Sequence, residues 1–348
     1  SLFFFDVSIN TISIISKIAS PVKIPVYINS LARRTTILVF LPITAPYWRF
    51  VVIYYEKIVY FMPEKSHINQ QVHKMNQKKE CMDVHVNGLK FHVQTFGSGV
   101  PIIMIMGLGA PGDKWKHNYE LLSKWFWCIV PDNRGAGLSD KPEAESYTTE
   151  QMADDIIGIM DTLDIKKAHV MGVSMGGAIA QQVALKVPDR VLSLILTSTF
   201  ASVSPAFKKA LNLICELKED TDPAVLKQLN LWMTYGQYTQ IHHPEKIEKS
   251  IEEDAAYPYP MPVYAYKAQC GACLSHNTAG RLHELKMPVL IAAGAKDLFM
   301  NIEKTMELVH GIPQAEFYLA PEGGHVHQWE YPEPYDSVVV GFLMKHTN

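Results

Sequence analysis

Ala168-His169-Val170-Met171-Gly172-Val173-Ser174-Met175-Gly176-Gly177-Ala178 is the stretch that decides the fold. Its first six residues form a largely apolar run that predicts a buried strand, and residues 176–186 predict a helix. Ser174 lies between them in a G-x-S-x-G pattern, the sharp strand-to-helix turn called a nucleophile elbow. Glycine at 172 and 176 removes side chains that would clash across such a turn. We therefore predict that Ser174 is a nucleophile; the alternative is a serine in an ordinary glycine-rich turn.

Other short apolar runs recur on both sides of this stretch, with helical patterns between them. A helix is predicted to begin at Thr148, with Thr149 as its cap. Strands that alternate with helices imply a mostly parallel sheet covered on both faces, so the fold class is α/β. The predicted strands are 101–106, 127–130, 168–173, 191–196, 288–293 and 316–319, after a hairpin of 83–86 and 90–93 around Asn87-Gly88.

The alternation stops between residues 200 and 286. Helices are predicted over 206–217, 224–235 and 244–254, followed by a proline-rich connector at 257–262. We interpret 200–286 as a helical cap over the carboxyl ends of the strands, where open α/β sheets bind ligands.

A serine hydroxyl is a poor nucleophile until a base takes its proton. In this chain order the acid follows the serine and the histidine comes last. Asp297 ends a predicted strand and is our candidate acid, unless it only caps the helix near Asn301. His325, after two glycines, is the candidate base, and His327 is its competitor.

An oxyanion hole needs two aimed hydrogen-bond donors. One candidate is the backbone N–H of Met175, directly after the nucleophile, and the other is that of Leu108 in the loop Met106–Gly109. Residues 132–135 also follow a strand, but they precede the serine and are interpreted as a structural loop.

From Met75 to its end the chain resembles the α/β-hydrolase superfamily, in the group with a helical cap. It is similar to esterases, cofactor-free haloperoxidases and the enol-lactonases of aromatic catabolism. The resemblance implies an eight-stranded, mostly parallel sheet and a Ser174–Asp297–His325 triad. Many relatives carry histidine before the oxyanion-loop glycine, where this chain has Met106. The matching segments are Gly107-Leu108-Gly109, 131–139, 172–177, 294–297 and 323–325.

Within this superfamily we expect a serine hydrolase that cleaves a carboxylic ester of a small, largely apolar substrate. Lactone, thioester or carbon–carbon bond hydrolysis can use the same triad, and a ligand receptor with little turnover is the alternative from another class. Epoxide hydrolases and dehalogenases use an aspartate nucleophile, which Ser174 argues against. The side chains Trp232, Met233, Tyr235 and Tyr264 suggest an apolar pocket, but the substrate-binding residues remain unassigned.

Composition limits the remaining classes. The 348 residues carry a formal net charge of −3, so no basic field favours nucleic acid. Five cysteines do not resemble a disulfide framework, so we expect a reducing, cytoplasmic location. Cys270, Cys273 and His276 are too few ligands for a structural zinc site, and we expect no metal. Without a G-x-G-x-x-G or P-loop signature, no cofactor is expected.

Residues 1–74 differ in character from the rest, since no glycine precedes Gly88. Residues 37–55 are the one candidate for membrane association, although Pro42, Pro46 and Arg49 interrupt them. Alternatively, the segment is a translated untranslated region and the protein starts at Met75. We therefore expect the hydrolase domain to span 75–348.

Overall fold

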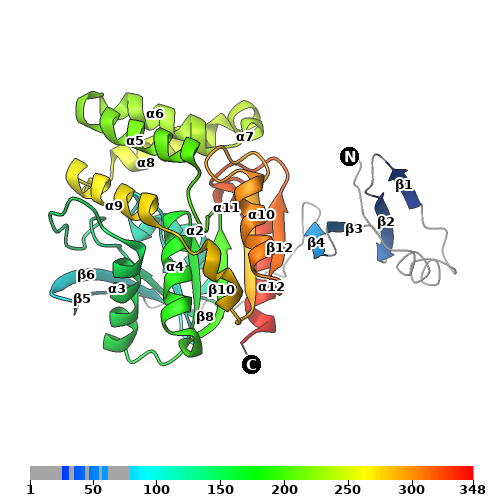
Figure 1. Ribbon diagram of the computed structural model, residues 1–348, viewed down its shortest axis with the longest axis horizontal. Coiled ribbons are helices and arrows are strands. Elements are labelled where there is room, and N and C mark those ends of the chain that lie inside the picture. Colours follow the sequence, from blue (N-terminus) through cyan, green and yellow to red (C-terminus); the bar gives the residue numbers. More distant parts are fainter. Residues whose placement is uncertain (1–25, 31–34, 44–46, 55–56, 62–78, 348) are drawn as a thin grey trace. The chain divides into compact units, whose positions relative to one another are not determined.

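The strands and helices predicted from residue 83 onward occur in the same order in the computed structural model (Figure 1). The structure describes residues 26–30, 35–43, 47–54, 57–61 and 79–347. The chain divides into two compact units. One holds β1–β4 together with residues 316–319, and the other holds the rest of the described chain.

Eight strands from Glu80 onward follow one another in the sheet in the order β5-β6-β8-β7-β9-β10-β11-β12. Parallel pairs join β8 to β7, β7 to β9, β9 to β10 and β10 to β11, whereas β5–β6 and β6–β8 are antiparallel. The mostly parallel α/β sheet is therefore confirmed. The strands are β5 Glu80–Val86, β6 Leu89–Phe96, β7 Val100–Ile105, β8 Phe126–Pro131, β9 Ala168–Val173, β10 Val191–Thr197, β11 Val289–Gly294 and β12 Glu316–Ala320.

The predicted hairpin forms between β5 and β6. Val86 pairs with Leu89, and Asn87 and Gly88 have φ values of 53° and 77°. Positive φ at both central residues is what a two-residue hairpin turn needs, and Asn-Gly supplies it at low cost.

Helices cover the sheet because the parallel strands are apolar throughout; all six residues of β9 are buried. Helix α4 packs on β9 and β10, and α10 packs on β11. The cap of α3 was predicted one residue too late: Thr148, not Thr149, accepts the Gln151 N–H at 3.1 Å. The helices outside the cap are α2 Lys116–Leu122, α3 Thr149–Thr162, α4 Met175–Lys186, α10 Ile302–Gly311, α11 His327–Glu330 and α12 Pro332–Lys345, with short 3₁₀ turns at Gly112–Trp115 and Pro188–Arg190. A third 3₁₀ turn, Ala279–Glu284, lies near the end of the cap segment.

The cap contains the three predicted helices and two more. Figure 1 shows α5, α6, α7 and α8 gathered beyond one end of the sheet, and α5 packs on α9. The bounds are α5 Pro205–Asp220, α6 Pro223–Thr234, α7 Gln237–His242, α8 Pro244–Ala255 and α9 Val263–Ser275.

The strands before residue 62 are described by themselves. They are β1 Val26–Ser30, β2 Thr35–Ile43, β3 Tyr47–Tyr54 and β4 Lys57–Phe61, each antiparallel to the next. The membrane candidate at 37–55 falls on β2 and β3, apart from 44–46 and 55, which lie outside the described residues. Across the described parts of the chain, no helix is both long and apolar enough to cross a bilayer. The expected start at Met75 lies outside the described residues, and it stays a prediction, as does the cytoplasmic location.

Candidate active site

Ser174 lies at the turn between β9 and α4, in a backbone conformation that non-glycine residues rarely adopt. Its φ and ψ are 56° and −121°. Such strain persists only where the surroundings enforce it, and it concentrates at functional sites. Here the Ser174 N–H donates to the Thr197 carbonyl at 2.9 Å, and the Thr199 hydroxyl donates to the Ser174 carbonyl at 2.6 Å. The end of the neighbouring strand β10 and the residues directly after it thus fix the elbow.

The two glycines of the elbow are required by close backbone approach. A Cβ at Gly172 would collide with the Gly176 carbonyl, and a Cβ at Gly176 would collide with the Ile105 carbonyl at the end of β7. The turn therefore packs directly against the strand that leads into the oxyanion loop, Met106–Gly109.

Asp297 and His325 are joined directly. The His325 Nδ1 lies 2.8 Å from the Asp297 Oδ2, and the carboxylate is fully buried. The other carboxylate oxygen accepts the N–H groups of Phe299 and Met300 at 2.8 and 2.9 Å. With Nδ1–H donated to the carboxylate, the imidazole Nε2 is left as the acceptor. Asp297 does not cap α10, because Asn301 accepts the Lys304 N–H there.

The histidine loop, Gly323–Val326, is held by the cap and by a buried carboxylate. The His325 N–H donates to the Thr234 carbonyl at 2.7 Å, just where α6 ends. Glu330 accepts from the N–H of Gly324 at 2.6 Å and from that of Gly236 at 2.7 Å. Burial raises the pKa of Glu330, although these N–H groups oppose the shift. Glu330 thus links the histidine loop to the cap.

His327 occupies a different environment from His325. It is completely buried, its ring packs edge-on against Tyr335, and burial lowers its pKa to about 4. A side chain enclosed in this way cannot exchange protons readily with a substrate. The contact with Asp297 belongs to His325, which is why we keep His325 as the candidate base.

The oxyanion loop passes close to the elbow. A Cβ built on Gly107 would lie 3.2 Å from the Ser174 Cβ. Met175 is the first residue of α4, so its N–H belongs to the helix turn that has no intrahelical acceptors. Met175 therefore follows Ser174 directly in the chain, and the loop that carries Leu108 lies beside Ser174 in space.

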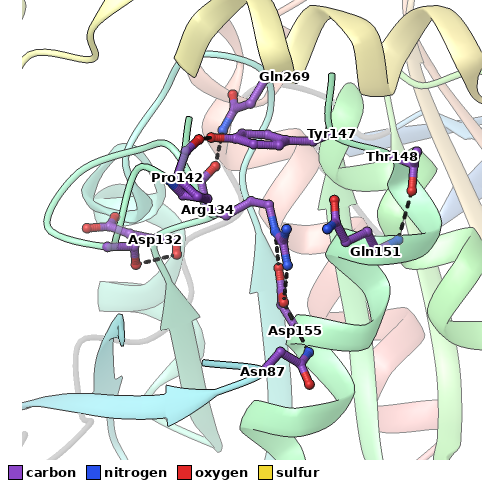
Figure 2. Close-up of polar contacts among 10 residues, drawn as sticks. Asn87, Asp132, Arg134, Pro142, Tyr147, Thr148, Gln151, Asp155 and Gln269 are labelled. Carbon is purple, nitrogen blue, oxygen red and sulfur yellow. Dashed lines mark hydrogen bonds and ion pairs between the residues drawn. The ribbon is translucent and has the colours of Figure 1, made fainter. Parts of the chain in front are cut away.

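The loop after β8 is structural, in line with its interpretation from the sequence. Asp132 accepts from the N–H of Gly112 at 2.6 Å and from that of Leu138 at 2.8 Å. Arg134 forms a buried two-point ion pair with Asp155 of α3, with both N···O distances at 2.6 Å (Figure 2).

The cysteines and histidine considered as metal ligands have other partners. The Cys270 sulfur lies 2.6 Å from the Cys215 sulfur on α5, and the His276 Nδ1 lies 2.8 Å from the Thr149 hydroxyl. Within the part of the chain that the structure describes, no three His, Cys, Asp or Glu side chains cluster as a metal site.

The aromatic side chains suggested for an apolar pocket do not form one group. Trp232 is 60% exposed and Tyr264 is 41% exposed, so neither belongs to an enclosed pocket wall. Tyr235 instead packs with Leu231 and Val326, which adds an apolar contact between the cap and the histidine loop.

Sequence analysis missed Glu330 and a second buried polar residue, Gln269 of α9. Glu330 meets Gly236 across 94 positions and Gln269 meets Gly109 across 160 positions. No local spacing signals such contacts; a charged or amide side chain inside an otherwise apolar pattern was the only hint available.

Residues 100–332 match the family model described as the alpha/beta hydrolase fold. This chain belongs to the α/β-hydrolase family. Among curated proteins, it is 28% identical to the putative carbamate hydrolase RutD of Caulobacter vibrioides over 243 residues. The aligned region covers 70% of this chain and 89% of RutD. It is 27% identical to a 2-hydroxy-6-oxo-6-phenylhexa-2,4-dienoate hydrolase of Burkholderia cepacia, over 74% and 92% of the two chains.

Solved structures of hydrolases also match this chain. An esterase from Thermogutta terrifontis superposes with a TM-score of 0.68 at 27% identity and covers 78% of this chain and all of its own. The enol-lactonase from Burkholderia xenovorans gives 0.69 at 25% identity, over 76% of this chain and all of its own. The relatives are hydrolases with different named substrates, so the comparisons support a hydrolase and leave its substrate open.

Proposed function

We propose that this family member is a serine hydrolase that cleaves a carboxylic ester of a small, largely apolar substrate. Ser174 is its nucleophile, His325 its general base and Asp297 the acid that orients the histidine. The observation that carries the proposal is the 2.8 Å contact between His325 and a fully buried Asp297, in a domain where the strained serine of the G-x-S-x-G elbow follows β9.

In the first step, His325 Nε2 removes the Ser174 proton as the serine oxygen attacks the ester carbonyl. Asp297 keeps the imidazole in the required tautomer and stabilises the imidazolium. The N–H groups of Leu108 and Met175 bind the oxyanion, and His325 returns the proton to the departing alcohol.

In the second step, water replaces the alcohol. His325 takes a proton from the water, and the hydroxide adds to the acyl carbonyl. The tetrahedral intermediate then collapses to the carboxylic acid as His325 returns the proton to the departing Ser174 oxygen, which restores free Ser174. No cofactor takes part in this sequence.

Ser174→Ala tests the proposal. Turnover of a p-nitrophenyl ester should fall by a factor on the order of 10⁶, as in other triad knockouts. Thr162→Ala serves as the control. The exposed Thr162 hydroxyl donates to the Gly158 carbonyl within α3, so its loss should leave turnover unchanged. A Ser174→Ala protein that keeps most of the activity would contradict the assignment.

The substrate is tested by a series of acyl chain lengths measured alongside a lactone, a thioester and a carbamate. Our proposal expects the highest kcat/KM for a short-chain ester. A clear preference for the carbamate or the lactone would retain the triad and replace the ester substrate. If a fluorophosphonate probe labels Ser174 but no substrate is turned over, the protein is a ligand receptor instead.

A further inference from the structure

A side chain of the cap holds the oxyanion loop from outside. The Gly109 N–H donates to the Gln269 Oε1 at 2.9 Å. Gln269 lies on α9 and is completely buried. A buried amide is costly unless both of its ends find partners, so its neighbours define what it does.

The other end of this amide is also bound. Gln269 Nε2 donates to the Arg134 carbonyl at 2.8 Å, as Figure 2 shows. One partner is an N–H group and the other is a carbonyl, so only one orientation of the amide satisfies both. Oε1 therefore points at the oxyanion loop and is not free to turn away.

The Arg134 backbone is itself anchored. Its guanidinium forms the two-point ion pair with Asp155, and the carboxylate accepts a further hydrogen bond from Asn87 at 3.3 Å. The Tyr147 ring lies against the guanidinium, 5.6 Å from centroid to carbon. Figure 2 shows these side chains in one continuous row from Asn87 to Gln269. The support under Gln269 is therefore rigid.

Helix α9 contacts the loop at a second point. Gly109 has a φ of 76°, and a Cβ there would come within 2.8 Å of the Tyr266 ring. Tyr266 and Gln269 are three residues apart, so they share one face of the helix. That face covers the oxyanion loop.

These contacts bear on the peptide group that carries the Leu108 N–H. Before it, the Met106 carbonyl accepts from Asn133 Nδ2 at 2.8 Å. After it, the Gly109 N–H is taken by Gln269. Both flanking peptide groups are pinned, so the peptide between Gly107 and Leu108 has little freedom to rotate.

We propose that Gln269 is a positioning residue of the reaction: by binding the Gly109 N–H, it orients the Leu108 N–H toward the oxyanion. The inference rests on the proposed function. Gln269 acts through the loop and does not touch the substrate. Together with Asn133 it supports the oxyanion loop, in which Met106 precedes Gly107.

Gln269→Leu removes both hydrogen bonds at similar volume. Because the Leu108 N–H acts mainly in the transition state, kcat should fall about 10- to 100-fold while KM changes little. A boronic acid that forms a tetrahedral adduct with Ser174 should lose affinity by the same factor. The carboxylic acid product should bind as it does to the wild type.

Gln269→Glu separates positioning from stability. Burial favours the protonated acid, whose carbonyl and O–H can replace the amide at both contacts. A buried carboxyl group lowers stability more than leucine does, because its ionisation in the unfolded state favours unfolding. We therefore expect the Glu variant to be less stable than the Leu variant and yet faster. A purely structural role predicts that kcat follows stability.

The matched control is Gln182→Leu. Gln182 is also buried, but its Nε2 donates to Glu150 at 2.7 Å between α4 and α3. It should lose stability without a selective loss of boronic acid affinity. If Gln269→Leu keeps the wild-type kcat and boronic acid affinity, the inference is wrong and the proposed function stands. If wild-type Ser174 forms no adduct and turns over no ester, the proposed function fails and the inference fails with it.

Discussion

The oxyanion loop and the histidine loop are both attached to the cap, but by different chemistry. The oxyanion loop donates the Gly109 N–H to a neutral amide, Gln269. The histidine loop donates the Gly324 N–H to a carboxylate, Glu330, which also binds Gly236 of the cap. The cap thus helps to hold both loops.

The two attachments respond differently to pH. A neutral amide keeps its donor and acceptor at every pH that the fold survives. A carboxylate with a raised pKa accepts both N–H groups strongly only while it is ionised, because protonation turns one of its oxygens into a donor. We therefore expect acid to act directly on the histidine loop, and to reach the oxyanion loop only indirectly, through ionisable groups near α9 such as His276 at its end.

The largest expected effect on the free energy of unfolding comes from breaking the Arg134–Asp155 ion pair behind Gln269. Arg134→Leu leaves the buried Asp155 carboxylate without its partner, which should lower the free energy of unfolding by about 3–5 kcal/mol. Urea unfolding at pH 7 measures it. Adding Asp155→Leu should recover much of the loss, because the uncompensated charge is then gone. If the free energy of unfolding of Arg134→Leu lay within about 1 kcal/mol of the wild-type value, this account would be contradicted.

The next effect tests the carboxylate of the histidine loop. In Glu330→Gln one amide NH₂ must face a backbone N–H, either that of Gly324 or that of Gly236. We expect a loss of about 1–3 kcal/mol in unfolding free energy, together with a lower kcat because the His325 loop is released. Steady-state kinetics and urea unfolding measure the two quantities. Glu333→Gln, at an exposed position of α12, is the control and should change neither.

A smaller effect tests how acid reaches the oxyanion side. His276 directly follows α9, and burial lowers its pKa from 6.5 to about 4. The imidazole is neutral in the folded protein, so the stability it contributes is complete above pH 6.5 and is lost as the pH falls toward 4. Between pH 7 and pH 5 this single group should account for about 1–2 kcal/mol of unfolding free energy.

His276→Gln removes that titration and should flatten the stability profile by the same amount. Unfolding curves at pH 7 and pH 5 measure it. His85→Gln, at an exposed position of β5, is the matched control. An unaltered slope in the His276 variant would show that its burial does not couple to folding.

The same comparison shows how far sequence reasoning reaches. The strands, the elbow and the order of Ser174, Asp297 and His325 follow local rules of apolar period, glycine and chain order, and the structure joins Asp297 to His325. Thr149 was one residue too late as a cap because two adjacent threonines offer the same hydroxyl.

The attachments to the cap follow no such rule. Gln269 lies on a helix whose residues show no clear polar and apolar faces, and its partners come from two other loops. Glu330 lies in a four-residue helix, and burial alone distinguishes it from any surface glutamate. Such contacts are set by tertiary packing, which a single sequence does not display.

In the mechanism we propose, Ser174 carries the acyl group during turnover. Acid quenching of the wild-type protein within milliseconds of mixing with a p-nitrophenyl ester, followed by peptide mass spectrometry, tests it most directly. We predict the acyl mass on the peptide that contains Ser174, and its absence in Ser174→Ala. Steady ester turnover with the acyl group on another residue, or with no acylated peptide at all, would contradict the account.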